Sequence, residues 1–284
     1  MTWTTWRQHR AEALAGLAAL VLGVACVLYA GTRRGFAGDA VLSGALIIGL
    51  GVAPALVGVF LGAPLLSRDL ERGTHRLVWT QGTTRARWLT LKLLLVFGAV
   101  VPAGAILGGL AVAAATGQHW SIPFLWFDET GPAFAGYVAF AMALGVAAGA
   151  ALRRSYPAMA LTLVLFVTVR VVVGAVFRPN YLPPLRVPVA ALGRMTVPNG
   201  DAWTLGIQGR DAAGHQLSSG DLISAIQQHH GDTVFGHYGI TAWLLYQPGD
   251  RFWLFQGIET AIFAALAALL VGFTAYWVLR RVEA

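Results

Sequence analysis

The chain carries very little charge for its length. Of its 284 residues only 12% are Asp, Glu, Lys or Arg, whereas 57% are hydrophobic, and the mean hydropathy is +0.64. A soluble domain would carry about 25% charged residues. The composition therefore excludes an ordinary soluble domain and predicts a protein that crosses a membrane several times.

The chain also lacks residues that nucleotide binding, disulfide formation and catalysis require. The single lysine, Lys92, lies between two leucines, so the Gly-x-x-x-x-Gly-Lys-[Ser/Thr] loop that cradles phosphates is missing. The single cysteine, Cys26, excludes an intrachain disulfide. The Gly-x-Ser-x-Gly nucleophile turn does not occur either. We therefore expect neither a nucleotide site nor enzymatic activity in this chain.

One group of potential metal ligands lies in the polar region before the last apolar run. Its members are His229, His230, Asp232 and His237. Zinc motifs usually add a His-Glu-x-x-His pattern or paired cysteines, and neither accompanies this group. We interpret these histidines as solvated loop residues and predict no metal.

Six apolar runs are long enough for the helix of about 20 residues that crosses a ~30 Å hydrocarbon layer. They are Ala11–Tyr29, Val41–Ala63, Leu89–Ala115, Pro132–Leu152, Tyr156–Val176 and Phe252–Leu279. The predicted fold class is all-α, a polytopic membrane protein with six transmembrane helices. We expect helices one to five in residues 1–176, an extracellular segment in 177–251, and helix six with a tail in 252–284.

Basic residues indicate the orientation of these spans. Most of them precede the first span, lie between spans two and three, join spans four and five, or follow the last span. The positive-inside rule places that side in the cytoplasm, with both termini. The net charge of +7 then needs no nucleic acid as a partner. We predict a multi-pass protein of the plasma membrane.

The segment 177–251 is the only sizeable polar region. Residues Trp203–Gln208 and His215–Leu217 flank a Gly-containing turn and predict a hairpin. A short capped helix is expected from Ser219 onward. A segment of this size makes a poor independent core, so we expect it to pack on the span ends or on a second copy.

Residues 64–92 concentrate basic side chains between two apolar runs. Ser67 can cap a helix whose first turn holds Asp69 and Glu71, as a helix dipole prefers. Leucines would then share one face and basic residues the other, which describes an amphipathic helix near the inner headgroups. The residues themselves leave two interpretations open: a helix bound to anionic lipid, or an element that docks a partner.

The spacing within this segment resembles a known family. Glu71-x-Gly73-Thr74, followed by Arg85 and Lys92, is similar to the first cytoplasmic loop of type-2 ABC exporter permeases. The amino-acid sequence of residues 5–10, 72–81 and 246–260 resembles that of actinobacterial permeases of this type. The resemblance covers nearly the whole chain. Gly82 departs from the family, which often has proline there, so the family's turn shape is not expected to carry over to this position.

The resemblance implies that segment 64–92 holds a coupling helix that docks on a separate ATP-binding subunit. The implied docking residues are Arg68, Asp69, Glu71, Arg72, Gly73, Thr74, His75, Arg76, Trp79 and Arg85. It also implies two ATP-binding subunits, which hold ATP and Mg, and a second permease copy, most simply in a homodimer. Alternating access by such an exporter, with apolar walls, would suit a hydrophobic or amphiphilic substrate.

Two charges fall within spans, Arg170 in the fifth and Glu259 in the sixth. Counted from the outer span ends they lie at a similar depth, so we predict that they pair. Charges inside a membrane are rare and mark functional sites by default, yet the pair has two open interpretations. It is either a polar gate that contacts substrate, or a structural ion pair.

Small residues recur at four-residue spacing, which permits close approach of helices. The pairs are Gly58 and Gly62, Gly104 and Gly108, and Gly145 and Gly149. They predict helix packing either within one subunit or across a dimer.

A second class of function also fits the sequence. A membrane sensor or regulatory protein would use the external segment 177–251 for a ligand and the basic segment 64–92 for a cytoplasmic partner. Stimulation of ATP hydrolysis in a partner separates the two classes, because only the exporter requires it.

Overall fold

The structure is a computed structural model. It describes residues 23, 25–27, 29, 40–73, 84–115, 124–188, 202–218, 220–221, 224 and 241–281. The chain divides into a helical unit and a sheet unit. The helical unit comprises residues 1–120, 126–171 and 256–284, and the sheet unit comprises residues 121–125 and 172–255.

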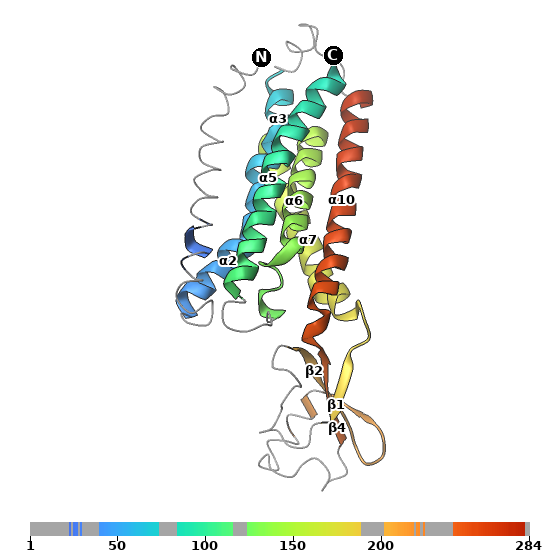
Figure 1. Cartoon of the computed structure of the whole chain (residues 1–284). Coiled ribbons are helices and arrows are strands. Elements are labelled where there is room, and N and C mark those ends of the chain that lie inside the picture. Colours follow the sequence, from blue (N-terminus) through green and yellow to red (C-terminus); the bar gives the residue numbers. More distant parts are fainter. Residues whose placement is uncertain are drawn as a thin grey trace. The chain divides into compact units, whose positions relative to one another are not determined.

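Long helices dominate the structure (Figure 1). In chain order they are α2 (Ala40–Val57), α3 (Ala63–Glu71), α5 (Arg85–Ala115), α6 (Gly131–Leu152), α7 (Ser155–Val172) and α10 (Phe252–Arg281). A π-helical segment, η2 (Gly58–Gly62), joins α2 to α3 without a break.

Five stretches of helix among the described residues are long and apolar enough to span a membrane. They are Gly44–Glu71, Arg85–Ala114, Gly131–Leu152, Ser155–Asn180 and Gly249–Arg281. These correspond to five of the six predicted spans. The first predicted span, Ala11–Tyr29, lies almost wholly outside the described residues, although residues 23, 25–27 and 29 are helical.

Helix α6 forms the core of the helical unit. In its most apolar window 78% of the residues are buried, against 11–33% in the other four spans. Its sequence is rich in Gly and Ala, which lets neighbouring backbones come close. The other helices expose large apolar side chains, as expected for surfaces that face lipid.

The boundary of the second span differs from the prediction. The sequence suggested that the span ends at Ala63 and that Ser67 caps a separate amphipathic helix. Instead one continuous helical rod runs through η2 and α3 to Glu71. Ser67 is fully buried inside α3, and its hydroxyl lies 2.8 Å from the Ala63 carbonyl of the preceding turn. The sequence suggests a helix start at Ser67 because a polar residue there can cap a helix, and its partner in another helix, Ser155, cannot be recognised from the sequence.

Helix α3 ends where the predicted interruption lies. The Gly73 N–H donates to the Leu70 carbonyl at 3.4 Å, and Gly73 has a φ of 68°. A backbone of that kind favours glycine, because a side chain would clash with the carbonyl. Residues 74–83, which hold the rest of the predicted coupling helix, lie outside the described residues.

The sheet unit corrects the all-α fold class. It holds a four-stranded sheet in the order β1-β4-β2-β3, with strands β1 (Leu185–Pro188), β2 (Trp203–Arg210), β3 (Gln216–Leu217) and β4 (Thr241–Gln247). Each of the three neighbouring pairs is antiparallel. Ala242 and Leu244 of β4 are buried and pack with apolar residues of the other three strands.

The hairpin predicted over Trp203–Gln208 and His215–Leu217 is present as β2 and β3. Its turn is closed by Asp211, whose carboxylate accepts the His215 N–H at 2.8 Å. This hydrogen bond lowers the pKa of the Asp211 carboxyl. The helix predicted from Ser219 and the histidine group near His229 lie largely outside the described residues.

A glutamine and an arginine fix the junction between β4 and α10 within the sheet unit. The Gln247 side chain is fully buried and donates to the Pro179 and Leu182 carbonyls at 3.1 and 2.8 Å. Arg251 donates to Gln247 Oε1 at 2.7 Å and to the Pro183 carbonyl at 2.9 Å. The chain that follows α7 is thereby tied to the chain that enters α10.

Candidate functional site

Among the described residues of the helical unit, polar side chains gather at two places about 22 Å apart along α7, at 1.5 Å per residue. The first, here called the ion cluster, consists of Asp128, Tyr137, Arg170, Gln256 and Glu259. The second, here called the α3–α7 contact, consists of Ser67, Glu71 and Ser155. Arg170 lies near the end of α7, whereas Ser155 is its first residue.

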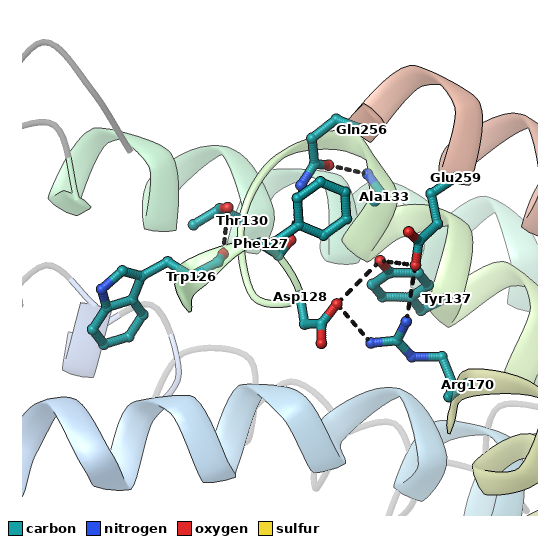
Figure 2. Close-up of polar contacts among 9 residues, drawn as sticks. All are labelled: Trp126, Phe127, Asp128, Thr130, Ala133, Tyr137, Arg170, Gln256 and Glu259. Atoms are coloured by element: carbon teal, nitrogen blue, oxygen red, sulfur yellow. Dashed lines mark hydrogen bonds and ion pairs between the residues drawn. The ribbon is translucent and has the colours of Figure 1, made fainter. Parts of the chain in front are cut away.

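The centre of the ion cluster is the guanidinium of Arg170 (Figure 2). It lies 3.2 Å from Oε1 of Glu259 and 3.1 Å from Oδ1 of Asp128. Glu259 is fully buried, and the Arg170 side chain is 15% exposed. The structure thus brings together the two charges that the sequence placed within spans, and it adds a second carboxylate to them.

Tyr137 of α6 completes the cluster. Its hydroxyl donates to Glu259 Oε1 at 2.8 Å and lies 3.5 Å from Asp128 Oδ1. Because one hydroxyl carries one proton, the shorter contact to Glu259 is the hydrogen bond. The Arg170 guanidinium lies over the Tyr137 ring, 3.5 Å from its centroid, so the ring shields and stabilises the cation.

Gln256 lies in α10, one turn before Glu259, and its side chain binds the start of α6. Its Oε1 accepts the Ala133 N–H at 2.9 Å, and its Nε2 donates to the Phe127 carbonyl at 2.8 Å. The first N–H groups of a helix have no partner in the helix itself. Thr130 does not supply one, because its hydroxyl donates to the Trp126 carbonyl. A fully buried glutamine from another helix therefore caps α6.

The ion cluster joins α6, α7 and α10 through groups that have little access to water. Removing one partner of a buried ion pair leaves an uncompensated charge and costs about 3–5 kcal/mol. The ion cluster therefore holds α6, α7 and α10 together strongly. Its more open side is Asp128, whose side chain is 37% exposed.

The α3–α7 contact is smaller and closer to solvent. Oε2 of Glu71, the last residue of α3, accepts the Ser155 N–H at 3.2 Å and the Ser155 hydroxyl at 3.0 Å. A carboxylate at this place also complements the positive end of the α7 dipole. Ser67, one turn earlier in α3, lies 3.0 Å from the Ser155 hydroxyl.

Two further contacts surround this contact. Lys92 of α5 forms an ion pair with Asp69, donates to the Leu65 carbonyl at 3.3 Å, and lies 5.0 Å from the Trp88 ring centroid. Arg153, between α6 and α7, donates to the Arg281 carbonyl at 3.2 Å. The ends of α3, α5, α7 and α10 are thus linked on the side from which the basic segment departs.

The predicted docking residues separate into three groups in the structure. Glu71 and Asp69 have partners inside the helical unit, as described above. Arg68 is half-buried in α3, Arg72 is exposed at its end, Gly73 follows it, and Arg85, the first residue of α5, is half-buried. Glu71 also lines an open pocket of about 620 Å³ together with Leu70, Arg153, Arg154, Tyr156 and Pro157. Thr74, His75, Arg76 and Trp79 lie outside the described residues.

The predicted glycine pairs lie at close approaches to α6, or within it. A Cβ at Gly58 would lie 2.5 Å from the Ala141 carbonyl oxygen, and one at Gly108 would lie 2.5 Å from the Gly131 carbonyl oxygen. A Cβ at Gly145 would collide with backbone atoms of Gly58 and Ala63. The remaining members also face neighbouring helices, Gly62 near Met142, Gly104 near Val138 and Gly149 near Ala63.

Several members of the two clusters were missed in the sequence. Asp128 was assigned to a loop, and Tyr137 and Gln256 carry no charge that would mark them within an apolar run. Ser155 follows two arginines, Arg153 and Arg154, and a neutral serine at that position carries no signal of its own. A usable signal existed for Gln256, which lies three residues before Glu259, on the same face of one helix.

The comparisons with known proteins give one match. A family model described as ABC-2 membrane transporter related matches residues 4–178, which is more than half of the chain. The matched range includes the described spans from α2 to α7 and both the Glu71 and Arg170 positions. Neither the curated proteins nor the solved structures contain a match.

Proposed function

Because the chain belongs to the ABC-2 membrane transporter related family, we propose that it is the membrane-spanning permease subunit of an ATP-driven exporter. The observation that carries the proposal is the match over residues 4–178. The five apolar spans support a transport role. Hydrolysis of ATP, with Mg, is assigned to a separate ATP-binding subunit, since this chain has no phosphate-binding loop.

The proposed site of coupling is the basic segment that follows α3. Two copies of the ATP-binding subunit would dock on it from the cytoplasm, through residues such as Arg76 and Trp79, because arginine and tryptophan are frequent interface anchors. A second copy of this chain, in a homodimer, would complete the pathway. The scarcity of charged residues within the spans favours a hydrophobic or amphiphilic substrate, moved by alternating access.

Co-purification tests the assignment directly. The chain is expressed together with its neighbouring reading frames, isolated from detergent-solubilised membranes, and assayed for a bound ATP-binding protein and for ATP hydrolysis. We expect a stable complex whose ATP hydrolysis exceeds that of the ATP-binding protein alone. Arg76→Ala and Trp79→Ala should weaken the complex, whereas Arg87→Ala, an exposed arginine outside the proposed docking set, serves as the matched control.

The sensor interpretation predicts a different outcome, namely no stimulated ATP hydrolysis in any complex. Orientation provides an independent check. In a Cys26→Ser background, His75→Cys should react with an impermeant maleimide only when the cytoplasmic face is accessible. Reaction at that position in intact cells would place the docking segment outside the cell and contradict the proposal.

A further inference from the structure

We propose that Ser67, Glu71 and Ser155 form a releasable contact through which α3 positions the first turn of α7, and that this contact opens and closes during transport. The inference rests on the proposed function for its second half only. The claim that α3 positions the first turn of α7 depends only on distances and burial within the helical unit.

Glu71 and Ser67 hold Ser155 at two points on one face of α3. They are four residues apart, so their side chains lie on neighbouring turns of the same helix. Glu71 accepts two hydrogen bonds from Ser155, at 3.2 and 3.0 Å, and Ser67 lies 3.0 Å from its hydroxyl. A displacement at the end of α3 therefore acts directly on the first residue of α7.

The hydrogen bonds of this contact can change partners without leaving the buried Ser67 hydroxyl unpaired. The Ser155 hydroxyl donates to Glu71, so its oxygen is available to accept the Ser67 proton. Ser67 also has a nearer acceptor, the Ala63 carbonyl at 2.8 Å, and its single proton serves one of these two acceptors at a time. When α3 and α7 separate, the buried Ser67 hydroxyl keeps a hydrogen bond within its own helix.

The other two members face water. Glu71 is exposed and lines the open pocket of about 620 Å³, and Ser155 is partly exposed. Water can therefore replace each of their lost hydrogen bonds. An unsatisfied buried polar group is what makes most internal contacts costly to break, and opening here creates none. The contact is thus weak enough to cycle, yet it fixes one geometry when closed.

Opening can be measured at Ala158 of α7, which lies one turn after Ser155. Ala158 is fully buried in a cluster with Ala63 of α3 and Ala148 of α6. In the full-length Cys26→Ser chain, Ala158→Cys should react slowly with a polar maleimide, at a rate set by opening. Adding Ser155→Ala or Glu71→Gln should raise this rate about tenfold, the factor that about 1.4 kcal/mol produces.

Two controls separate positioning from general damage. Ser155→Thr retains the hydroxyl and should keep the slow rate. Thr168→Ala removes a hydroxyl elsewhere on α7, where it donates to the Val164 carbonyl of the same helix, and should leave the rate unchanged. Equal labelling rates in the original and the Ser155→Ala chains would overturn the inference.

A disulfide tests the role in transport and does not depend on packing around Ala158. The 3.0 Å between the two hydroxyls places Ser67 and Ser155 within reach of a disulfide. In the complex with the ATP-binding subunit, oxidised Ser67→Cys/Ser155→Cys should hydrolyse ATP at least tenfold more slowly, and reductant should restore the rate. Unchanged hydrolysis in the fully oxidised complex would show that the contact does not open during the cycle.

The two proposals fail in different ways. If no ATP-binding subunit associates with the original chain, the exporter assignment is wrong, while Ala158→Cys labelling still decides whether α3 releases α7. If the complex forms but Ser155→Ala changes neither labelling nor hydrolysis, the exporter assignment stands and the releasable contact is refuted.

Discussion

The two ends of α7 are held by opposite kinds of contact. Near its C-terminal end, Arg170 binds fully buried Glu259 and packs on the Tyr137 ring. At its N-terminal end, Ser155 is held by Glu71, which faces water, and by a serine with an alternative acceptor. The first contact cannot open without exposing the apolar interior to a bare charge, whereas the second can open freely.

This difference identifies where α7 can move. A helix fixed at one end and loosely held at the other pivots about the fixed end. Under the proposal of a releasable contact, the ion cluster is the pivot that ties α7 to α6 and α10, and the α3–α7 contact is the mobile end. Stability and positioning then depend on different residues of the same helix.

The largest effect is expected from Glu259→Gln. The substitution removes the negative charge opposite Arg170 while keeping the shape of the side chain. Leaving that arginine without one of its two carboxylates should lower stability by about 3–5 kcal/mol, because Glu259 is fully buried. Thermal unfolding of the purified chain in detergent, followed by tryptophan fluorescence, provides the measurement.

Rescue by charge reversal sharpens this prediction. The double variant Arg170→Glu/Glu259→Arg restores the pair but sets the reversed carboxylate against Asp128, which lies 3.1 Å from the guanidinium. Rescue should therefore be partial, and adding Asp128→Asn should improve it. A double variant as stable as the original chain would mean that Asp128 contributes nothing to the pivot.

Gly145→Ala tests whether α6 must pack closely against the continuous helix formed by α2, η2 and α3. The added methyl group would collide with backbone atoms of Gly58 and Ala63, which cannot rotate away. Overpacking of this kind costs about 1–3 kcal/mol. The control is Gly98→Ala in α5, where no atom lies within 4 Å of the added group. Gly98→Ala should leave stability unchanged or raise it slightly, because alanine is the better helix former. A comparable loss in both variants would show that close approach of the helices is not responsible.

Gln256→Leu removes the cap of α6 while keeping an apolar side chain of similar size. The Ala133 N–H and the Phe127 carbonyl would both lose their partner in a buried setting. A loss of about 1–3 kcal/mol is expected for groups left unsatisfied. Gln256→Glu keeps an acceptor for Ala133 but has no donor for Phe127 and buries an unpaired carboxylate, so it should lose at least as much stability as Gln256→Leu. Unchanged melting of Gln256→Leu would show that the cap does not stabilise α6.

Part of this organisation could be predicted from the sequence. Hydropathy located the five described spans because each needs a long apolar run, and charge located Arg170 and Glu259 because charges in such runs are rare. Periodicity could not identify α6 as the core, since a helix that faces lipid is as apolar as one that faces protein. The small residues of α6 were the only indication, and they left a dimer interface equally open.

Other features depended on contacts that local sequence does not contain. Ser67 looked like a helix cap because its partner, Ser155, lies 88 residues away. The strand β4 was missed because its pairing partners β1 and β2 precede it by long stretches of chain. Asp128 joined the ion cluster only because the fold places its turn beside α7.

The smallest effect is expected from Lys92→Met, at the mobile end. The substitution keeps the length of an apolar stem over Trp88 but removes the ion pair with Asp69 and the hydrogen bond to the Leu65 carbonyl. Both charged side chains are partly exposed, at 17% and 28%, so the pair should contribute about 1 kcal/mol or less to stability. Melting should barely change, while the link between α5 and α3 is lost. Lys92→Arg keeps the charge and should preserve both properties. A melting loss as large as that of Glu259→Gln would show that the surroundings of the α3–α7 contact stabilise the helical unit as strongly as the ion cluster does.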